Sequence, residues 1–202
     1  MINQVNMDGV SSYGTGAASV PKGGYVCRIL GVTVKQNSKG QYLELGCDIA
    51  EGEYAGIFLK DFREQTGDNK KWHCNAFVNI PLGNNTEQDG WTKRAFKTFY
   101  EALEASNPNY HFDWDETKMK GLLVGALFSG REYRGNDGNV YEAVAINGWT
   151  SVDNIRTGKY KLPKDKHLKE QAAGGSFGGN VSVTSSSPNG FSVPGADDDL
   201  PF

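Results

Sequence analysis

The stretch Gly23-Gly-Tyr-Val-Cys-Arg-Ile-Leu-Gly-Val-Thr-Val34 has the pattern of one long β-strand whose side-chain alternation slips at Gly31. A glycine inside a strand marks a bulge or a sharp coil, which lets one strand serve two sides of a small barrel. This strand therefore predicts a curled antiparallel sheet.

The next segments continue the strand pattern. After a turn at 37–40, residues 41–49 alternate cleanly. The side chains predicted to face the core are Leu43, Leu45, Cys47 and Ile49, and those predicted to face outward are Tyr42, Glu44 and Asp48. A third strand region is predicted over 54–62 and a further one over 71–80.

One amphipathic helix follows these strands. Its predicted apolar face consists of Trp91, Ala95, Phe96, Phe99 and Leu103. Asp89 or Thr92 could cap its start, and Asn107-Pro108 is expected to end it.

The last two predicted strands cover 122–134 and 140–151, and Asn-Asp-Gly between them is a hairpin signal. A main helix between the third and fourth strands is the order of an OB-fold. We therefore expect a mainly β, OB-fold-like five-stranded barrel over 21–170, after a loose lead-in over 1–20.

The composition changes abruptly at Gln171. The last 32 positions hold six Gly, six Ser and three Asp but no Lys or Arg, which predicts a disordered tail over 171–202. The net charge of −3 comes from this tail, because the rest of the chain has 21 basic and 21 acidic residues. A neutral body can still carry a local basic groove for phosphate.

The tail ends in a short acidic and apolar motif, made of Asp197, Asp198, Asp199, Leu200, Pro201 and Phe202. Carboxylates beside one aromatic ring suit an apolar pocket rimmed by Arg or Lys on another protein. We expect this tip to bind partner proteins; the alternative is a solubilising acidic end.

The tip resembles the C-terminal tip of bacterial-type single-stranded DNA-binding proteins, which end in acidic residues, an aliphatic residue, Pro and Phe. The body over about 20–168 resembles a phage and prophage family, once of unknown function and now regarded as single-stranded DNA-binding. The segments that carry this second resemblance are 21–27, 47–52, 106–115, 151–156 and 163–166. The resemblance implies replication or recombination proteins as partners and a bacterial host cell as location. Whether the chain forms a homo-oligomer stays open, because the tetramer of the bacterial type does not carry over.

Binding of single-stranded DNA needs aromatic faces for bases and cations for phosphates along one groove. The predicted groove residues are Tyr42, Lys60, Phe62, Arg63, Lys71, Trp72, Arg131, Tyr133, Arg134 and Tyr141. For each aromatic residue among them, core packing is the alternative role. Because Trp72 and Phe77 fall on opposite faces of one strand, at least one should be core. The basic stretch 156–169 could be a flanking clamp, a platform for the tip, or a solubilising charge run.

The sequence shows no enzyme signature, and we expect no cofactor and no metal. Cys27, Cys47 and Cys74 are too widely spaced for a zinc site and should be small buried hydrophobes. No apolar run is long enough to span a membrane and the start lacks a signal-peptide pattern, so cytoplasmic location is expected. Two alternatives remain: a protein-binding adaptor whose barrel does not bind DNA, and a nuclease that uses the carboxylates Asp113, Asp115 and Glu116.

Overall fold

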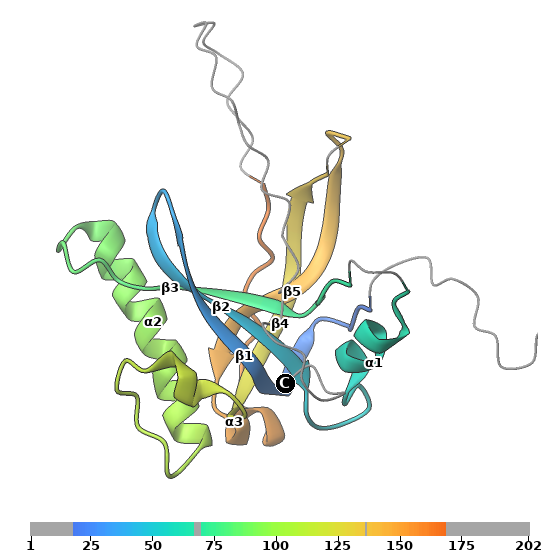
Figure 1. Ribbon diagram of the computed structural model, residues 1–202, viewed down its shortest axis with the longest axis horizontal. Helices are drawn as coiled ribbons and strands as arrows, with labels where there is room; N and C mark the ends of the chain where they lie inside the picture. Colours follow the sequence, from blue (N-terminus) through green and yellow to red (C-terminus); the bar gives the residue numbers. More distant parts are fainter. Residues whose placement is uncertain (1–17, 67–69, 136, 169–202) are drawn as a thin grey trace, which may run out of the picture.

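The computed structural model describes residues 18–66, 70–135 and 137–168. Its strands are β1 (Gly23–Asn37), β2 (Gly40–Ile49), β3 (Asn75–Asn79), β4 (Leu123–Arg134) and β5 (Val140–Thr150). Its helices are α1 (Ile57–Glu64), α2 (Glu87–Ser106), the 3₁₀ helix η1 (Glu116–Met119) and α3 (Val152–Arg156) (Figure 1). None of the helices in these ranges is long and apolar enough to cross a membrane.

The strands form one antiparallel sheet in the order β3-β2-β1-β4-β5. The main helix, α2, lies between β3 and β4 in the chain, so the predicted mainly β, OB-fold-like class is confirmed. The barrel is not closed, because the edge strands β3 and β5 approach each other without pairing in the described part of the chain. We call the space between these two edges the seam.

Strand β1 is the centre of the sheet. Its first residues, Gly23–Arg28, pair with β4, while Cys27–Asn37 pair with β2. The register of the β1–β2 pairing shifts between Ile29 and Gly31, which confirms the predicted irregularity at this glycine. One strand thus serves both halves of the sheet.

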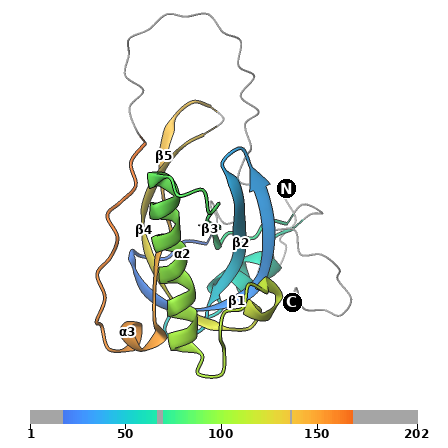
Figure 2. The ribbon, with the colours of Figure 1, turned by 90° about the vertical axis from the view of Figure 1, so that its left-hand side faces the viewer.

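Helix α2 covers one open end of the curled sheet (Figure 2). Its buried residues include Phe96, Phe99 and Leu103, as predicted, and the ring of Phe99 lies 5.0 Å from that of Trp149 in β5. Trp91 and Ala95 are exposed, so this part of the predicted apolar face is wrong. The buried side of α2 therefore runs through Phe96, Phe99 and Leu103, while Trp91 and Ala95 lie on its solvent side.

The cap of α2 also differs from the expectation. Thr86 caps the helix by accepting a hydrogen bond from the backbone N–H of Asp89, and Asn107 ends it as expected. The Asp89 carboxylate is buried instead, where it accepts hydrogen bonds from the backbone N–H groups of residues 82, 83 and 85. It therefore holds the β3–α2 loop against the helix.

The third strand region predicted over 54–62 is wrong, because most of it forms α1. Gly56 has a φ of 74°, a left-handed conformation that suits glycine, and the helix starts directly after it. Phe58 packs into the core, and its N–H donates to the Asp48 carboxylate at 3.2 Å. The strand after β2 is therefore β3 alone.

Two side chains of β2 predicted to face outward are buried. Glu44 and Asp48 are 2% and 6% exposed. The Lys35 ammonium from β1 pairs with Glu44, and the start of α1 covers Asp48. Burial raises the pKa of Asp48 above its usual range, although its backbone N–H donors oppose that shift.

The segment 164–168 lies along the second half of β4, past Phe128, the last β4 residue that pairs with β1. Lys166 exchanges backbone hydrogen bonds with Gly130 and Glu132, and the Asp165 carboxylate accepts from the Gly130 N–H at 2.7 Å. An ion pair of 2.7 Å links Asp165 to Lys22. Part of the basic stretch 156–169 is thus docked on the sheet, and we call residues 164–168 the strap.

Candidate nucleic-acid interface

The β4–β5 hairpin carries an exposed pair of aromatic rings. Tyr133 and Tyr141 are partners in register, and their rings stack with centroids 5.8 Å apart and planes at 29°. They are 45% and 44% exposed. Arg131 lies on the same face two residues before Tyr133. This hairpin therefore presents rings and a cation together, outside the core.

The turn of the hairpin fixes the position of these rings. Gly138 has a φ of 81°, and the Arg134 guanidinium donates to its carbonyl oxygen at 2.6 Å. The Tyr141 hydroxyl donates to the Asp137 carboxylate at 2.5 Å, and this bond lowers the pKa of Asp137. The ring of Tyr141 is therefore held at both ends, which reduces the entropy lost when a base stacks on it.

A second aromatic pair lies on the outward face of β2 and β3. The half-buried ring of Tyr42 meets Phe77 edge to face, with centroids 5.9 Å apart. Phe77 is 45% exposed, between the buried residues Ala76 and Val78. Lys35 is the β1 neighbour of Tyr42. Phe77 was not among the predicted groove residues; its position opposite Trp72 on the strand was the available signal.

Trp72 belongs to the core. It is 3% exposed, and its indole N–H donates to the carbonyl oxygens of Cys47 and Cys74, both at 3.1 Å. Neither ring face is open to a base. The three cysteines are buried as well, as expected, and burial raises the pKa of each thiol.

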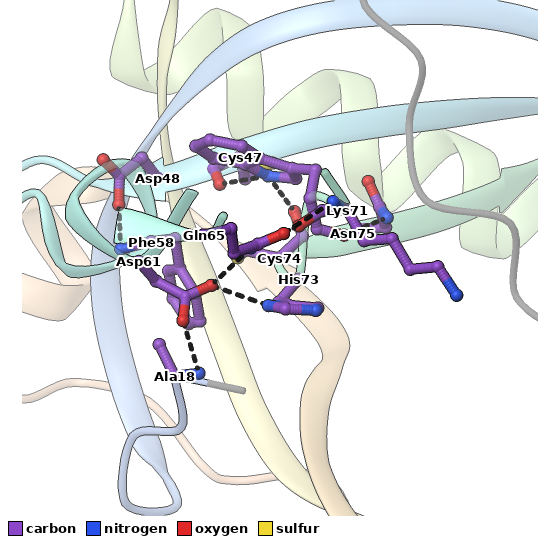
Figure 3. A network of polar contacts seen from close by, with 11 residues as sticks. Ala18, Cys47, Asp48, Phe58, Asp61, Gln65, Lys71, His73, Cys74 and Asn75 are labelled. Carbon is purple, nitrogen blue, oxygen red and sulfur yellow. Dashed lines mark hydrogen bonds and ion pairs between the residues drawn. The ribbon is translucent and has the colours of Figure 1, made fainter. Parts of the chain in front are cut away.

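The predicted residues of α1 and of the α1–β3 connection form a separate group. Phe62 is half-buried against Trp72, with centroids 5.6 Å apart, while Lys60, Arg63 and Lys71 are exposed. Gln65 holds the backbone of Lys71 through two hydrogen bonds of 2.7 and 2.8 Å (Figure 3). These residues therefore form a cluster of their own, on α1 and on the segment before β3.

The two long hairpins of the sheet, β1–β2 and β4–β5, point to the same end of the molecule in both views (Figures 1 and 2). Strand β3 crosses the sheet between them in Figure 1. OB-folds bind oligonucleotides on the face of their second and third strands, between the loops of these two hairpins. The aromatic pairs Tyr42–Phe77 and Tyr133–Tyr141 therefore lie on the strands that border this surface.

The carboxylates considered for a nuclease have structural partners. Asp115 caps η1 by accepting from the Thr117 N–H at 3.1 Å, and Lys118 pairs with Asp113. Among the described residues, no group of three or more His, Cys, Asp or Glu is placed to hold a metal ion.

The tip residues Asp197–Asp199, Leu200, Pro201 and Phe202 lie outside the described residues. No protein-family model matches the chain, and no curated protein does. Function is therefore inferred from the side chains themselves.

Proposed function

We propose that this chain binds single-stranded DNA without sequence preference, and protects it during replication or recombination. The observation that carries the proposal is the pair of aromatic clusters, Tyr42–Phe77 and Tyr133–Tyr141, on the strands bordering one face of an OB-fold-like sheet. Stacking on aromatic rings suits any base, because every base has a π-face. Without a ligand that covers them, exposed aromatic rings cost free energy because their apolar surface stays in contact with water.

The charges around these rings support a nucleic-acid ligand. Arg131 and Arg134 flank Tyr133, and Lys35 and Lys39 lie near the tip of the β1–β2 hairpin. Lys35 and Glu44 neutralise each other as an ion pair, and the Asp137 carboxylate accepts from Tyr141. The guanidinium groups of Arg131 and Arg134 are therefore the charges beside Tyr133 that suit phosphate groups.

The proposal includes recruitment of replication or recombination proteins through Asp197–Phe202, in the cytoplasm of a bacterial host cell. A short apolar tip with several carboxylates suits a basic-rimmed pocket on a partner. The negative charge of the tail cannot add to phosphate affinity, so recruitment and DNA binding use different parts of the chain.

Fluorescence anisotropy with labelled oligo-dT tests the proposal on the full chain. Binding should weaken steeply with salt, with a slope of about −0.7 per phosphate contacted, and a duplex of equal length should bind less well. A chain truncated after residue 170 should bind at least as tightly. No binding at low salt would refute the proposal and favour the adaptor alternative, whereas magnesium-dependent cutting of the oligonucleotide would favour the nuclease.

A further inference from the structure

The seam between β3 and β5 contains a pocket of about 400 Å³, bordered on a third side by α2. This volume lies within the range of about 300–1,000 Å³ that is typical of small-molecule sites. Phe77 of β3 lines the pocket and also belongs to the Tyr42–Phe77 pair. The pocket is therefore continuous with the proposed DNA-binding face.

Trp91 of α2 is the largest exposed ring at this pocket. It is 59% exposed, and the guanidinium of Arg94 lies 4.5 Å from its ring centroid. Arg94 stacks on the indole, and the exposed part of Trp91 offers a surface on which a planar ligand can stack. An arginine stacked on an aromatic ring also places a positive charge beside whatever stacks there.

The polar groups of the pocket suit a nucleotide. The amide side chains of Asn79 and Gln88 line it, and an amide offers both donors and an acceptor, so it can meet the edge of any base. Asn147 of β5 lines it too; this residue is the extra one at the β-bulge and donates to the Ser129 hydroxyl at 2.9 Å. The amide nitrogen of Asn147 is therefore bound to β4, and Asn79 and Gln88 are the amides proposed to meet a base.

The charge of the pocket is positive. Among the described residues that line it, Lys166 of the strap is the only charged one, and none is Asp or Glu. Burial, together with the nearby Arg131, lowers the pKa of Lys166, so an anion at this position would relieve an unfavourable environment. A phosphate group has the charge that fits.

We propose that the seam is a nucleotide-binding subsite: one base of the bound single strand stacks on Trp91, its edge meets Asn79 and Gln88, and its phosphate pairs with Lys166. This proposal rests on the proposed function and extends the path of the strand from the sheet face to α2. An extended peptide pairing with the free edge of β3 or β5 is the other occupant that the fold could accept.

The test compares two ligands, oligo-dT and an abasic strand of equal length, on four forms of the full chain. Trp91→Ala should weaken oligo-dT binding about 5- to 150-fold and barely change binding of the abasic strand. Lys166→Gln should weaken both strands alike and reduce the salt slope by about 0.7, because the abasic strand keeps its phosphates. Trp114→Ala is the matched control, since Trp114 is 68% exposed but lines a different pocket.

Trp91 lies outside the buried core, so Trp91→Ala should melt like the native chain. The proposal is overturned if Trp91→Ala binds both strands like the native chain, or if it weakens both equally. An effect of Trp114→Ala as large as that of Trp91→Ala would also overturn it. If the native chain binds neither strand, the proposed function itself fails. If the native chain binds oligo-dT but the affinity does not depend on Trp91, only the subsite fails.

Discussion

Replacing Tyr133 or Tyr141 with alanine should separate DNA affinity from stability. The two rings form an exposed cross-strand pair, 45% and 44% accessible. Such a pair contributes about 0.2–1 kcal/mol to the free energy of unfolding. For a domain of this size, that loss lowers the melting temperature by no more than about 4 °C.

The expected loss of DNA affinity is larger. A ring that stacks on a base contributes about 1–3 kcal/mol, which raises the Kd about 5- to 150-fold. Tyr141→Phe keeps the ring but loses the hydrogen bond to Asp137, so it should retain most of the affinity. The affinity loss therefore follows the ring and not the hydroxyl.

The assay pairs oligo-dT anisotropy with thermal melting monitored by circular dichroism. Phe99→Ala is the contrasting control, because Phe99 is fully buried and its truncation should cost about 3–5 kcal/mol of stability. Its DNA affinity, measured where the variant is folded, should stay native. Two tyrosine variants that melt and bind like the native chain would remove the β4–β5 hairpin from the interface.

Three further measurements test other parts of the molecule. Deleting Phe202 should abolish capture of replication proteins in a pull-down while leaving oligo-dT affinity unchanged; equal capture by both chains would leave the tip only a solubilising role. The Glu132 carboxylate raises the pKa of His167 above 6.5, so this contact stabilises the strap below that pH and is lost as pH rises through the raised pKa. In an NMR titration, Glu132→Gln should bring the pKa of His167 back toward 6.5, and an unchanged midpoint would contradict the assignment. Burial raises the pKa of Cys47 to about 12, so the native chain should resist iodoacetamide near pH 8 and react only when unfolded; rapid labelling of the folded chain would contradict the buried placement.

Local patterns in the sequence were sufficient for much of the sheet. The strand over 41–49, the slip at Gly31 and the hairpin of the last two strands each depend on a few neighbouring residues, and each is present in the structure. The predicted alternation of faces in 41–49 is wrong, because residues 43–49 are all buried. The segment 54–62 was different, because so short a stretch is too little to separate a helical from a strand period. Its helix is fixed by tertiary contacts, chiefly the burial of Phe58.

The faces of the strands were harder to predict than the strands. The strand predicted over 71–80 is shorter in the structure, where β3 is Asn75–Asn79 and Trp72 precedes it. One of Trp72 and Phe77 is core, as expected, but alternation does not say which of them. Glu44 was expected outside because it alternates with the apolar side chains of its strand, yet Lys35 from the neighbouring strand pairs with it and it is buried. An ion pair between two strands depends on which strands are neighbours in the sheet, and the sequence of one strand does not specify its neighbours.

The candidate interface could be predicted only where its residues lie close together in the chain. The tyrosines of the β4–β5 hairpin could be proposed because both of them flank a recognisable turn. Trp91 was assigned to the core, since its spacing matched the apolar stripe of α2, and only the position of the helix relative to β5 shows it exposed. The seam itself arises from two edges distant in the chain, so no local pattern could indicate it.

The pairing of β1 with β4 has a consequence for how the chain is made. Gly23–Arg28 find their partners at Leu123–Phe128, about a hundred residues later in the chain. A ribosome adding about 5–20 residues per second needs roughly 5–20 s to synthesise that interval. Throughout this time one edge of β1 is unpaired, and unpaired edges recruit other strands. The nascent chain therefore depends on the early β1–β2 hairpin, or on a chaperone, to avoid aggregation until β4 leaves the ribosome.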